Sequence, residues 1–323
     1  MAAQPQIAIE PAPARAAVAE LIRRARAAQS IFARYSQAQL DEVATAAGWA
    51  IMEPGRNREL AELAVRDTGL GNVADKIIKN HRKTLGLMRD LMHAKTTGVI
   101  AEHADTGITE IARPVGVVAA VVPSTNPGAT PANNIINALK CGNAVILSPS
   151  PKGYTTCAKL VAYIHAELTR VGAPLELVQM LPAPVTKESS TELMQQADLV
   201  VVTGSRANVR AGYSSGKPAL GVGAGNVAVI VDDSADVNDA AAKIMASKIF
   251  DNATSCSSEN SVIIHAKVYA AMLAALVREG GALLTAGEKA TLQKVMFPGG
   301  HLSSAVTAQA VTKICAIAGL TRP

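Results

Sequence analysis

One cysteine stands where a thiol could do chemistry rather than fill a core. Cys256 lies within the segment Asp251–Asn260, and eight of the nine residues that flank it there are polar. A structural cysteine usually behaves as a small buried hydrophobe, so a polar turn is an unusual place for one. The residues alone leave two interpretations open: Cys256 is a nucleophile, or it is an incidental loop thiol.

The other three cysteines fit structural roles. Cys141 ends a helical pattern before Gly142, whereas Cys157 and Cys315 lie inside helical patterns. No Cys-x-x-Cys and no Cys/His pair occurs at the spacing of metal ligands, so we predict no metal site. Four cysteines in 323 residues are also too sparse for a disulfide-rich secreted scaffold.

A cysteine hydrolase would need a base, usually a histidine that a third group orients. His265 ends the predicted strand after Cys256, but no partner motif accompanies it. A cysteine protease or thioesterase is therefore an open alternative that the sequence does not support. The remaining histidines are His81, His93, His103, His165 and His301, and those at 81, 93 and 165 lie in helical stretches that suit a surface or core role.

A thiol beside a nicotinamide suggests another reaction, in which the thiolate adds to an aldehyde, hydride leaves and a thioester remains. The oxyanion of that reaction needs hydrogen-bond donors, such as the Cys256 backbone N–H and a side-chain amide. Asn126, which is followed by Pro127, is the amide we select. A plain asparagine turn before proline explains the same residues equally well.

Four short apolar runs follow Ile111, and most of them lead into a helical pattern. Strands and helices that alternate at this spacing form βαβ units and a parallel sheet. We therefore expect an α/β protein with a Rossmann-like cofactor domain. The predicted strands are Val115–Val122, Ala144–Leu147, Leu177–Leu181 and Leu199–Val202, and the predicted helices are Pro131–Lys140, Lys152–Val171, Lys187–Gln196 and Arg206–Ser214.

Three small, polar loops follow these strands: Pro123–Pro127, Ser148–Pro151 and Thr203–Ser205. Ligands of parallel sheets bind outside the carboxyl ends of the strands. Each loop precedes a helix with a good start signal, at Thr130–Pro131, Ser150–Pro151 and Ser205. A helix N-terminus favours an anion by ~0.3–1 kcal/mol, and several can share one pyrophosphate. Serine and proline are common caps, but three such loops at one edge favour a nucleotide site.

The glycine-rich stretch Gly221–Gly225 does not match a dinucleotide fingerprint. Its spacing is not Gly-x-Gly-x-x-Gly, and it precedes the predicted strand Val227–Val231, whereas the fingerprint follows a strand and opens a helix. Glycines here are expected to let the backbone pass close to a ligand or another segment. On this ground we place Gly221 and Gly223 at the cofactor site, and we expect a hinge to a second domain.

The rest of the chain supplies the expected organisation. A helical front runs over Ala14–Met52, stops at Pro54–Gly55, and continues over 58–65 and Val73–His93. We find no chemistry in it. The second α/β domain is predicted from the strand Val227–Val231, the helix Val237–Phe250, the strand Ser261–His265 and the helical stretch Ala305–Ala318. The predicted organisation is a flexible leader at 1–13, a cofactor-binding domain at 14–225 and a catalytic domain at 226–323.

Composition excludes several classes of protein. Hydrophobic residues make up 49% and charged residues 18%, so the chain is not disordered, and aromatics at 3% imply a core of Ala, Val, Ile and Leu. The net charge of +5 is spread out, which argues against nucleic-acid binding. Met1–Ala12 lacks the apolar core of a signal peptide, and no apolar run approaches the ~20 residues of a membrane span. We expect a cytoplasmic protein.

Five motifs in order resemble the CoA-acylating branch of the aldehyde dehydrogenase superfamily. The resemblance covers roughly residues 14 to 300. The motifs are Val122–Pro127, Gly142–Pro149, Thr203–Ser205, Ser214–Asn226, and Phe250–Asn252 together with Cys256, Glu259 and Ser261–Val262.

The resemblance implies a role for each site residue. Cys256 would form a hemithioacetal and then an acyl-enzyme, and Asn126 would complete the oxyanion hole. The cofactor would be NAD or NADP, coenzyme A would be the co-substrate, and acetaldehyde, propionaldehyde and sulfoacetaldehyde are compatible aldehydes. The residues expected to bind the cofactor are Pro123, Ser124, Thr125, Ser148, Pro149, Ser150, Thr203, Gly204, Ser205, Gly221 and Gly223.

Three departures from the family pattern sharpen this interpretation. Hydrolytic members carry a glutamate, the base that activates water, at the position of Gly221, and a ribose-binding lysine at that of Ser148. The chain also stops at Pro323, so we expect an incomplete second domain and a homo-oligomer only if the missing part is supplied. The alternatives are a hydrolytic or semialdehyde dehydrogenase, or an inactive truncated paralogue that acts as an assembly partner.

Overall fold

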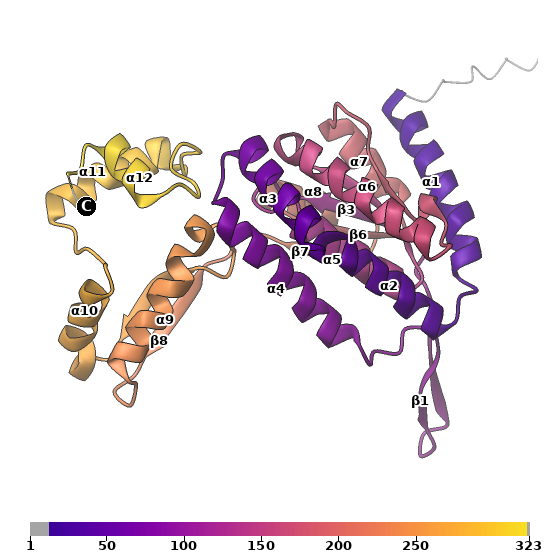
Figure 1. Cartoon of the computed structure of the whole chain (residues 1–323), viewed down its shortest axis with the longest axis horizontal. Coiled ribbons are helices and arrows are strands. Elements are labelled where there is room, and N and C mark those ends of the chain that lie inside the picture. The colour runs from indigo at the N-terminus through magenta and orange to yellow at the C-terminus, as the bar shows by residue number, and fades with distance from the viewer. Residues whose placement is uncertain (1–12, 322–323) are drawn as a thin grey trace, which may run out of the picture. The chain divides into compact units, whose positions relative to one another are not determined.

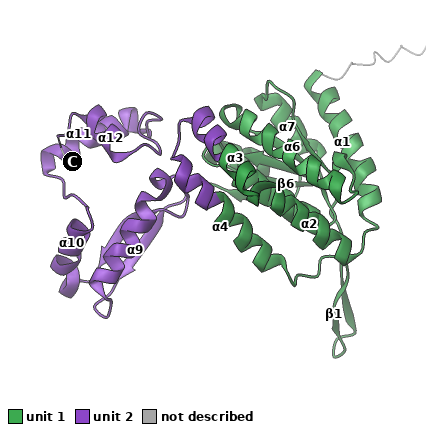
Figure 2. Cartoon of the chain, viewed as in Figure 1, with its two compact units in different colours: residues 1–60, 80–223 green, residues 61–79, 224–323 purple. Residues whose placement is uncertain are grey.

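A computed structural model describes residues 13–321 of the chain. It divides into two compact units, which Figure 2 colours separately: unit 1 comprises residues 1–60 and 80–223, and unit 2 comprises 61–79 and 224–323. Apart from Pro13, the leader expected at 1–13 lies outside the described residues. Residues 61–79, which the sequence assigns to the helical front, cluster with the second unit.

A five-stranded parallel sheet forms the centre of unit 1, as the strand–helix alternation predicts. Every residue of the central strands β3 and β4 is buried, because helices cover both faces of the sheet. The strand order is β5-β4-β3-β6-β7. The strands are β3 (Val117–Val122), β4 (Ala144–Pro149), β5 (Val178–Met180), β6 (Leu199–Thr203) and β7 (Ala219–Val222).

The connecting helices divide between the two faces of this sheet (Figure 1). From β3 the chain steps outward to β4 and β5, then returns to β6 and β7 on the other side of β3. Because such crossovers are right-handed, the first two helices cover one face and the last two cover the other. The helices are α5 (Ala129–Lys140) and α6 (Tyr154–Arg170), then α7 (Lys187–Gln196) and α8 (Arg206–Tyr213).

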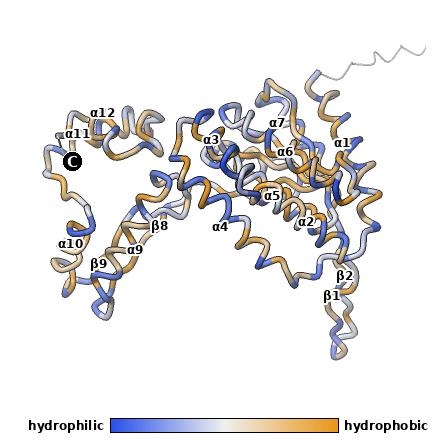
Figure 3. Tube along the Cα trace, viewed as in Figure 1, coloured by the Kyte–Doolittle hydropathy of each residue, from blue (hydrophilic) through white to orange (hydrophobic). Residues whose placement is uncertain are grey.

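The helical front adds a third helix to each face. α1 (Pro13–Phe32) contacts α7 and β4, and α2 (Gln37–Met52) contacts α5 and α6. Apolar and polar residues alternate along α1 (Figure 3), and its predicted apolar face is buried. The single stretch expected over 14–52 is wrong, because Ser36 caps a new helix in a reciprocal pair with Gln39.

One further expectation about the front is corrected, and the sequence interpretation missed a hairpin and one strand of the sheet. Pro54 opens α3 (Pro54–Thr68), because the first position of a helix needs no N–H donor. After α4 (Val73–Leu91) the chain forms an antiparallel hairpin of β1 (Gly98–His103) and β2 (Ile108–Ala112), which the sequence interpretation missed. β7 was also missed, since its four residues include a glycine.

Unit 2 contains a smaller parallel pair, and its core is built from Val231, Ala241, Ile244, Met272 and Ala275. The strands β8 and β9 match the prediction closely, whereas the last helix begins later than expected. Among the helices described, none is long and apolar enough to cross a bilayer. The elements are β8 (Val227–Val231), α9 (Val237–Ile249), β9 (Glu259–Ile264), α10 (Tyr269–Arg278), α11 (Ala286–Met296) and α12 (Val311–Ala318).

A half-buried carboxylate connects the starts of the central strands of unit 1. Asp198, just before β6, accepts two 2.8 Å hydrogen bonds from the Arg26 guanidinium and a third, also 2.8 Å, from the Val117 N–H. A Cβ at Gly116 would lie 3.0 Å from Asp198 Cγ, so only glycine fits there. Burial acts to raise the pKa of Asp198, but the hydrogen bonds from Arg26 and Val117 outweigh it, so the pKa is lowered.

We expect Asp198→Asn to lower the free energy of unfolding by about 1–3 kcal/mol at pH 7, because the charge-assisted bonds to Arg26 are lost. A carboxyl whose pKa is lowered on folding stabilises above its unfolded pKa of about 3.9, and that stability is lost as pH falls. The difference between wild type and variant, measured by urea unfolding, should therefore shrink below about pH 4. Asp90→Asn is the control, since Asp90 is exposed. A pH-independent difference would contradict the assignment.

Candidate functional site

The three polar loops of unit 1 lie at one edge of the sheet because their strands are parallel. The order of strands reverses between β3 and β6, which is where parallel sheets bind ligands. Hydrogen bonds fix the loops to this edge: the Ser150 N–H donates to the Val122 carbonyl at 3.0 Å, and the Gly204 N–H to the Val222 carbonyl at 3.0 Å. The structure thus brings together Pro123–Asn126, Ser148–Ser150 and Thr203–Ser205.

Helices begin directly after these loops, although not all at the predicted caps. Ser205 caps α8 as expected, and its hydroxyl accepts the Asn208 N–H at 3.3 Å. Ser150 precedes a short 3-10 helix with Pro151 in its first turn, but its side chain makes no capping bond. Thr130 is not a cap, because α5 begins at Ala129.

Ser148 and Pro149 are buried in β4, whereas Ser150 is half-buried. The Ser148 hydroxyl pairs with that of Ser190, on α7, at 2.9 Å. The structure therefore gives Ser148 a partner inside the protein, and its contact with a cofactor stays a prediction.

Asn126 is oriented by its own carbonyl oxygen. Its Oδ1 accepts the Ala129 N–H at 3.2 Å, at the first turn of α5. In the part of the chain that the structure describes, no group accepts a hydrogen bond from the Asn126 amino group. The side chain is half-buried, and the group left over is the donor that an oxyanion would need.

The glycine-rich stretch divides into residues with different surroundings. Gly221 belongs to β7 and packs against α8: a Cβ there would lie 2.7 Å from Val209 Cγ1 and 2.8 Å from Tyr213 Cε2. A Cβ added at Gly223 would have open space, since among the described residues it would approach only Val209 Cγ2, at 4.0 Å. Packing thus explains Gly221, and a cofactor role for either glycine stays a prediction.

Cys256 lies on a turn of unit 2 that the Ser258 N–H closes by donating to the Ser255 carbonyl at 3.0 Å. Its side chain is exposed, unlike those of Cys141, Cys157 and Cys315. Burial raises the pKa of Cys157 to about 12, so that thiol is inert at neutral pH. Cys141 and Cys315 are half-buried, so Cys256 differs from the other three cysteines in exposure, and its role as nucleophile stays a prediction.

Gly225 passes against the backbone of Cys256, within the same unit. A Cβ at Gly225 would overlap the Cys256 carbonyl oxygen and lie 3.3 Å from the Cys256 Cβ. The Gly225 carbonyl also accepts a 3.5 Å hydrogen bond from Asn260 Nδ2. The expectation that a glycine here allows close approach of another segment is confirmed, and that segment carries the thiol.

A histidine base is not found beside this thiol. In the described structure of unit 2, neither His265 nor His301 hydrogen-bonds to Cys256, and His265 Nδ1 instead accepts the Lys267 N–H at 3.4 Å. His165 binds the Val178 carbonyl at 2.7 Å, which is a structural role. The geometry gives the cysteine-hydrolase alternative no support.

Sequence reasoning missed one group of residues near the thiol. Asp251 is fully buried and contacts Lys76 and Lys79, at the start of α4, where the sequence showed no chemistry. The only local signal was an aspartate in the polar segment before Cys256. Its partners lie more than 170 residues earlier, so no spacing rule finds them.

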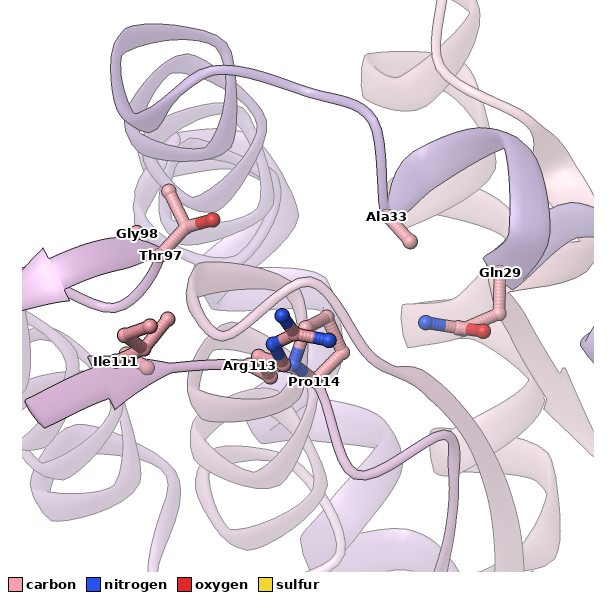
Figure 4. Close-up of a pocket in the computed structure, with 8 residues that line it drawn as sticks. Gln29, Ala33, Thr97, Gly98, Ile111, Arg113 and Pro114 are labelled. Carbon is pink, nitrogen blue, oxygen red and sulfur yellow. The ribbon is translucent and has the colours of Figure 1, made fainter.

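A pocket of about 430 Å³ opens at the base of the β1–β2 hairpin (Figure 4). Gln29, Thr97, Ile111, Arg113 and Pro114 are among the residues that line it. Because Arg113 and Pro114 precede β3, the pocket lies toward the amino ends of the strands. It is therefore separate from the edge that carries Asn126.

Comparisons with known proteins identify the family of the chain. Residues 2–317 match the model of the aldehyde dehydrogenase family. The chain belongs to the aldehyde dehydrogenase family. It is 64% identical over 315 residues to a sulfoacetaldehyde dehydrogenase (acylating) of Cupriavidus necator, which covers 97% of this chain and 64% of that protein.

Solved structures of the family share the fold. An acetylating aldehyde dehydrogenase from Geobacillus thermoglucosidasius superposes with a TM-score of 0.91 at 33% identity, over 96% of this chain and 68% of that one. A Rhodopseudomonas palustris propionaldehyde dehydrogenase with bound CoA and an acylated cysteine gives 0.84 at 26% identity, over 95% and 70%. The α/β fold and the resemblance to the acylating branch are confirmed. The chain spans 57–64% of the length of three curated relatives.

We expect Gly225→Ala to displace the turn that carries Cys256, because the added methyl overlaps its carbonyl oxygen. Overpacking of this kind costs about 1–3 kcal/mol of unfolding free energy. Hydrogen exchange of the 254–260 amides, followed by mass spectrometry, should become faster. Gly287→Ala is the control, since nothing lies within 4 Å of a Cβ there. Unchanged exchange in the Gly225 variant would show that the contact does not hold the turn.

Proposed function

We propose that this chain catalyses the oxidation of a short aldehyde to an acyl-CoA, with NAD or NADP as hydride acceptor and coenzyme A as acyl acceptor. One observation carries the proposal. The position at which hydrolytic members hold their general base is Gly221, and the side chains of Val209 and Tyr213 fill the space that a side chain there would enter. A glutamate does not fit, so the base that would activate water against a thioester is missing.

Cys256 supplies the nucleophile in this proposal. Its thiolate sulfur forms a bond to the aldehyde carbon while the carbonyl electron pair moves to oxygen, giving a hemithioacetal oxyanion. The Cys256 N–H and the Asn126 amino group donate hydrogen bonds to that oxyanion. A bound nicotinamide supplies the acceptor for the hydride that leaves the same carbon, and Cys256 is left as a thioester. The thiolate of coenzyme A then forms a bond to the thioester carbon, and the bond to Cys256 breaks so that its sulfur leaves as thiolate.

The carboxyl edge of the sheet in unit 1 suits a dinucleotide. Three loops of small residues and the starts of α5, α8 and the 3-10 helix Pro151–Gly153 supply N–H groups for a pyrophosphate. We assign this role to Pro123–Thr125, Ser148–Ser150 and Thr203–Ser205, with Gly221 and Gly223 beside them. Ser148–Lys152 contains no carboxylate that would repel a 2′-phosphate, so the proposal covers both NAD and NADP.

Among the compatible aldehydes we favour sulfoacetaldehyde, because a relative 64% identical to this chain carries that name. The net charge of +5 suits an anionic substrate and phosphate-bearing cofactors. We also expect a homo-oligomer if the C-terminal part of the family's catalytic domain is supplied. Four exposed apolar residues of the β1–β2 hairpin support this: Val99, Ile100, Ile108 and Ile111. A hydrolytic or semialdehyde dehydrogenase and a non-catalytic assembly partner are the alternatives that the assays below separate.

Formation of NADH or NADPH from an aldehyde should depend on coenzyme A, because without it the thioester accumulates after one turnover. The measurement is absorbance at the reduced nicotinamide band, with and without coenzyme A, for sulfoacetaldehyde, acetaldehyde and propionaldehyde. Mass spectrometry should find the acyl group on Cys256 when coenzyme A is omitted. Cys256→Ala should abolish turnover and leave cofactor binding unchanged. Equal steady rates without coenzyme A would support the hydrolytic alternative, and absence of an acyl group in a folded, cofactor-binding sample would support the assembly partner.

We expect Asn126→Ala to lower kcat about 10²–10³-fold, as removal of an oxyanion donor does, with a smaller effect on KM. Steady-state kinetics with saturating coenzyme A measure this. Asn137→Ala is the matched control, since Asn137 is exposed on α5 and, among residues 13–321, its side-chain amide donates only to the Asn133 carbonyl. A kcat for the Asn126 variant within a few-fold of wild type would remove this residue from the oxyanion hole.

A further inference from the structure

We propose that Asp251 is a positioning residue for Cys256, and that its buried carboxylate anchors the turn that carries the thiol to the start of α4. The inference rests on the proposed role of Cys256 as nucleophile. All residues involved belong to unit 2, so the argument uses contacts within one compact unit.

The Asp251 carboxylate is completely surrounded by donors. Its Oδ1 accepts the Asn72 N–H at 3.0 Å, and its Oδ2 accepts Lys76 Nζ at 3.1 Å and is also bound by Lys79 Nζ. The side chain of Asp251 is 0% exposed, and those of Lys76 and Lys79 are 5% and 3% exposed. Charges this deeply buried are tolerated when they are paired, so the three groups hold one another in place.

The two lysines reach one carboxylate because of helix geometry. Residues three apart lie on one face of a helix, and Lys76 and Lys79 have this spacing in the first turns of α4. Burial lowers the pKa of Lys76, and the Asp251 carboxylate opposes that shift. Loss of the carboxylate would therefore leave buried ammonium groups without their main counter-charge.

The backbone of Asp251 is held as firmly as its side chain. Its N–H donates to Asp75 Oδ2 at 2.7 Å, and the same oxygen accepts Asn72 Nδ2 at 2.6 Å. Gly71, with φ of +71°, leaves room for the carboxylate, since a Cβ there would lie 2.7 Å from Asp251 Cγ. The segment 71–79 therefore surrounds Asp251 from several sides.

The anchored residue begins an unusual stretch of backbone. Asp251, Asn252 and Ala253 all have left-handed φ values, of 51°, 52° and 57°. Three consecutive non-glycine residues in this region persist only where the surroundings determine them, and such conformations cluster at functional sites. The Asp251 carbonyl then accepts the Thr254 N–H at 3.1 Å, which turns the chain toward Cys256.

The turn thus has two fixed points. Asp251 anchors the chain five residues before the thiol, and Gly225 contacts the backbone of Cys256 itself. Between them the thiol is exposed, on a turn whose start is set by buried ion pairs. A nucleophile must be held near its attack geometry, and a small misplacement is costly in rate. We infer that the Asp251 anchor supplies this rigidity.

The test uses the full chain with Asp251→Ala, which removes every acceptor of the carboxylate. We expect kcat to fall about 10²-fold while KM for the aldehyde and for coenzyme A changes little. Hydrogen exchange of the 252–258 amides should become at least about tenfold faster. Asp251→Asn keeps one acceptor for the Asn72 N–H, so its kcat should lie between those of wild type and the alanine variant. Asp239→Ala, which removes an exposed aspartate of α9, is the control.

A double variant separates positioning from mere stability. In Asp251→Ala, Lys79 becomes a buried cation without its counter-charge, and adding Lys79→Met removes that cation. The double variant should therefore have a higher unfolding free energy than Asp251→Ala, but its kcat should stay low because the anchor is still absent. If the double variant recovered kcat as well as stability, the proposal would be overturned. The same holds if Asp251→Ala kept the kcat and the hydrogen-exchange rates of the wild type. If Asp251→Ala does not fold, kcat and hydrogen exchange of Asp251→Asn test the proposal instead. If the wild type shows no turnover, the proposed function fails, and hydrogen exchange alone tests whether Asp251 fixes the turn.

Discussion

Parallel pairing of β3 with β4 on one side and β6 on the other is the constraint on which the site of unit 1 depends. It buries the central strands on both faces and brings all carboxyl ends to one edge. Loops that are far apart in the chain, such as those at Asn126 and Thr203, therefore share that edge. Asp198 fixes the opposite ends of the same strands through Val117 and Arg26. The small polar residues of these loops therefore all lie at the carboxyl edge of the sheet.

Unit 2 carries an exposed thiol on a turn, and contacts elsewhere in the unit hold that turn in place. Cys256 is exposed and therefore accessible. The burial of Cys157 raises the pKa of that thiol to about 12, so it is unreactive at neutral pH. The rigidity comes from two residues that precede Cys256 in the chain. Gly225 has no side chain, so its backbone meets that of Cys256, and the buried Asp251 is bound by Lys76 and Lys79. Accessibility and order are thus supplied by separate residues.

The packing of Gly221 connects the fold to the choice of reaction. A glutamate at this position would have to displace Val209 and Tyr213 of α8, which cover β7. The same contacts that complete the sheet edge therefore exclude a general base there. In the proposed reaction, a thioester that finds no general base at this position persists until a thiol attacks it, which is the physical basis for proposing acyl transfer rather than hydrolysis.

Local patterns in the sequence were sufficient for the strand–helix alternation, the buried face of α1 and the polar setting of Cys256, because each depends on neighbouring residues. They failed at β7 and at the β1–β2 hairpin, whose strands are defined by pairing partners rather than by their own periodicity. The Ser148–Ser190 contact and the grip of Lys76 and Lys79 on Asp251 were decided only by tertiary structure. Those side chains meet across 42 to 175 residues of chain, and only the folded path brings them within hydrogen-bond distance.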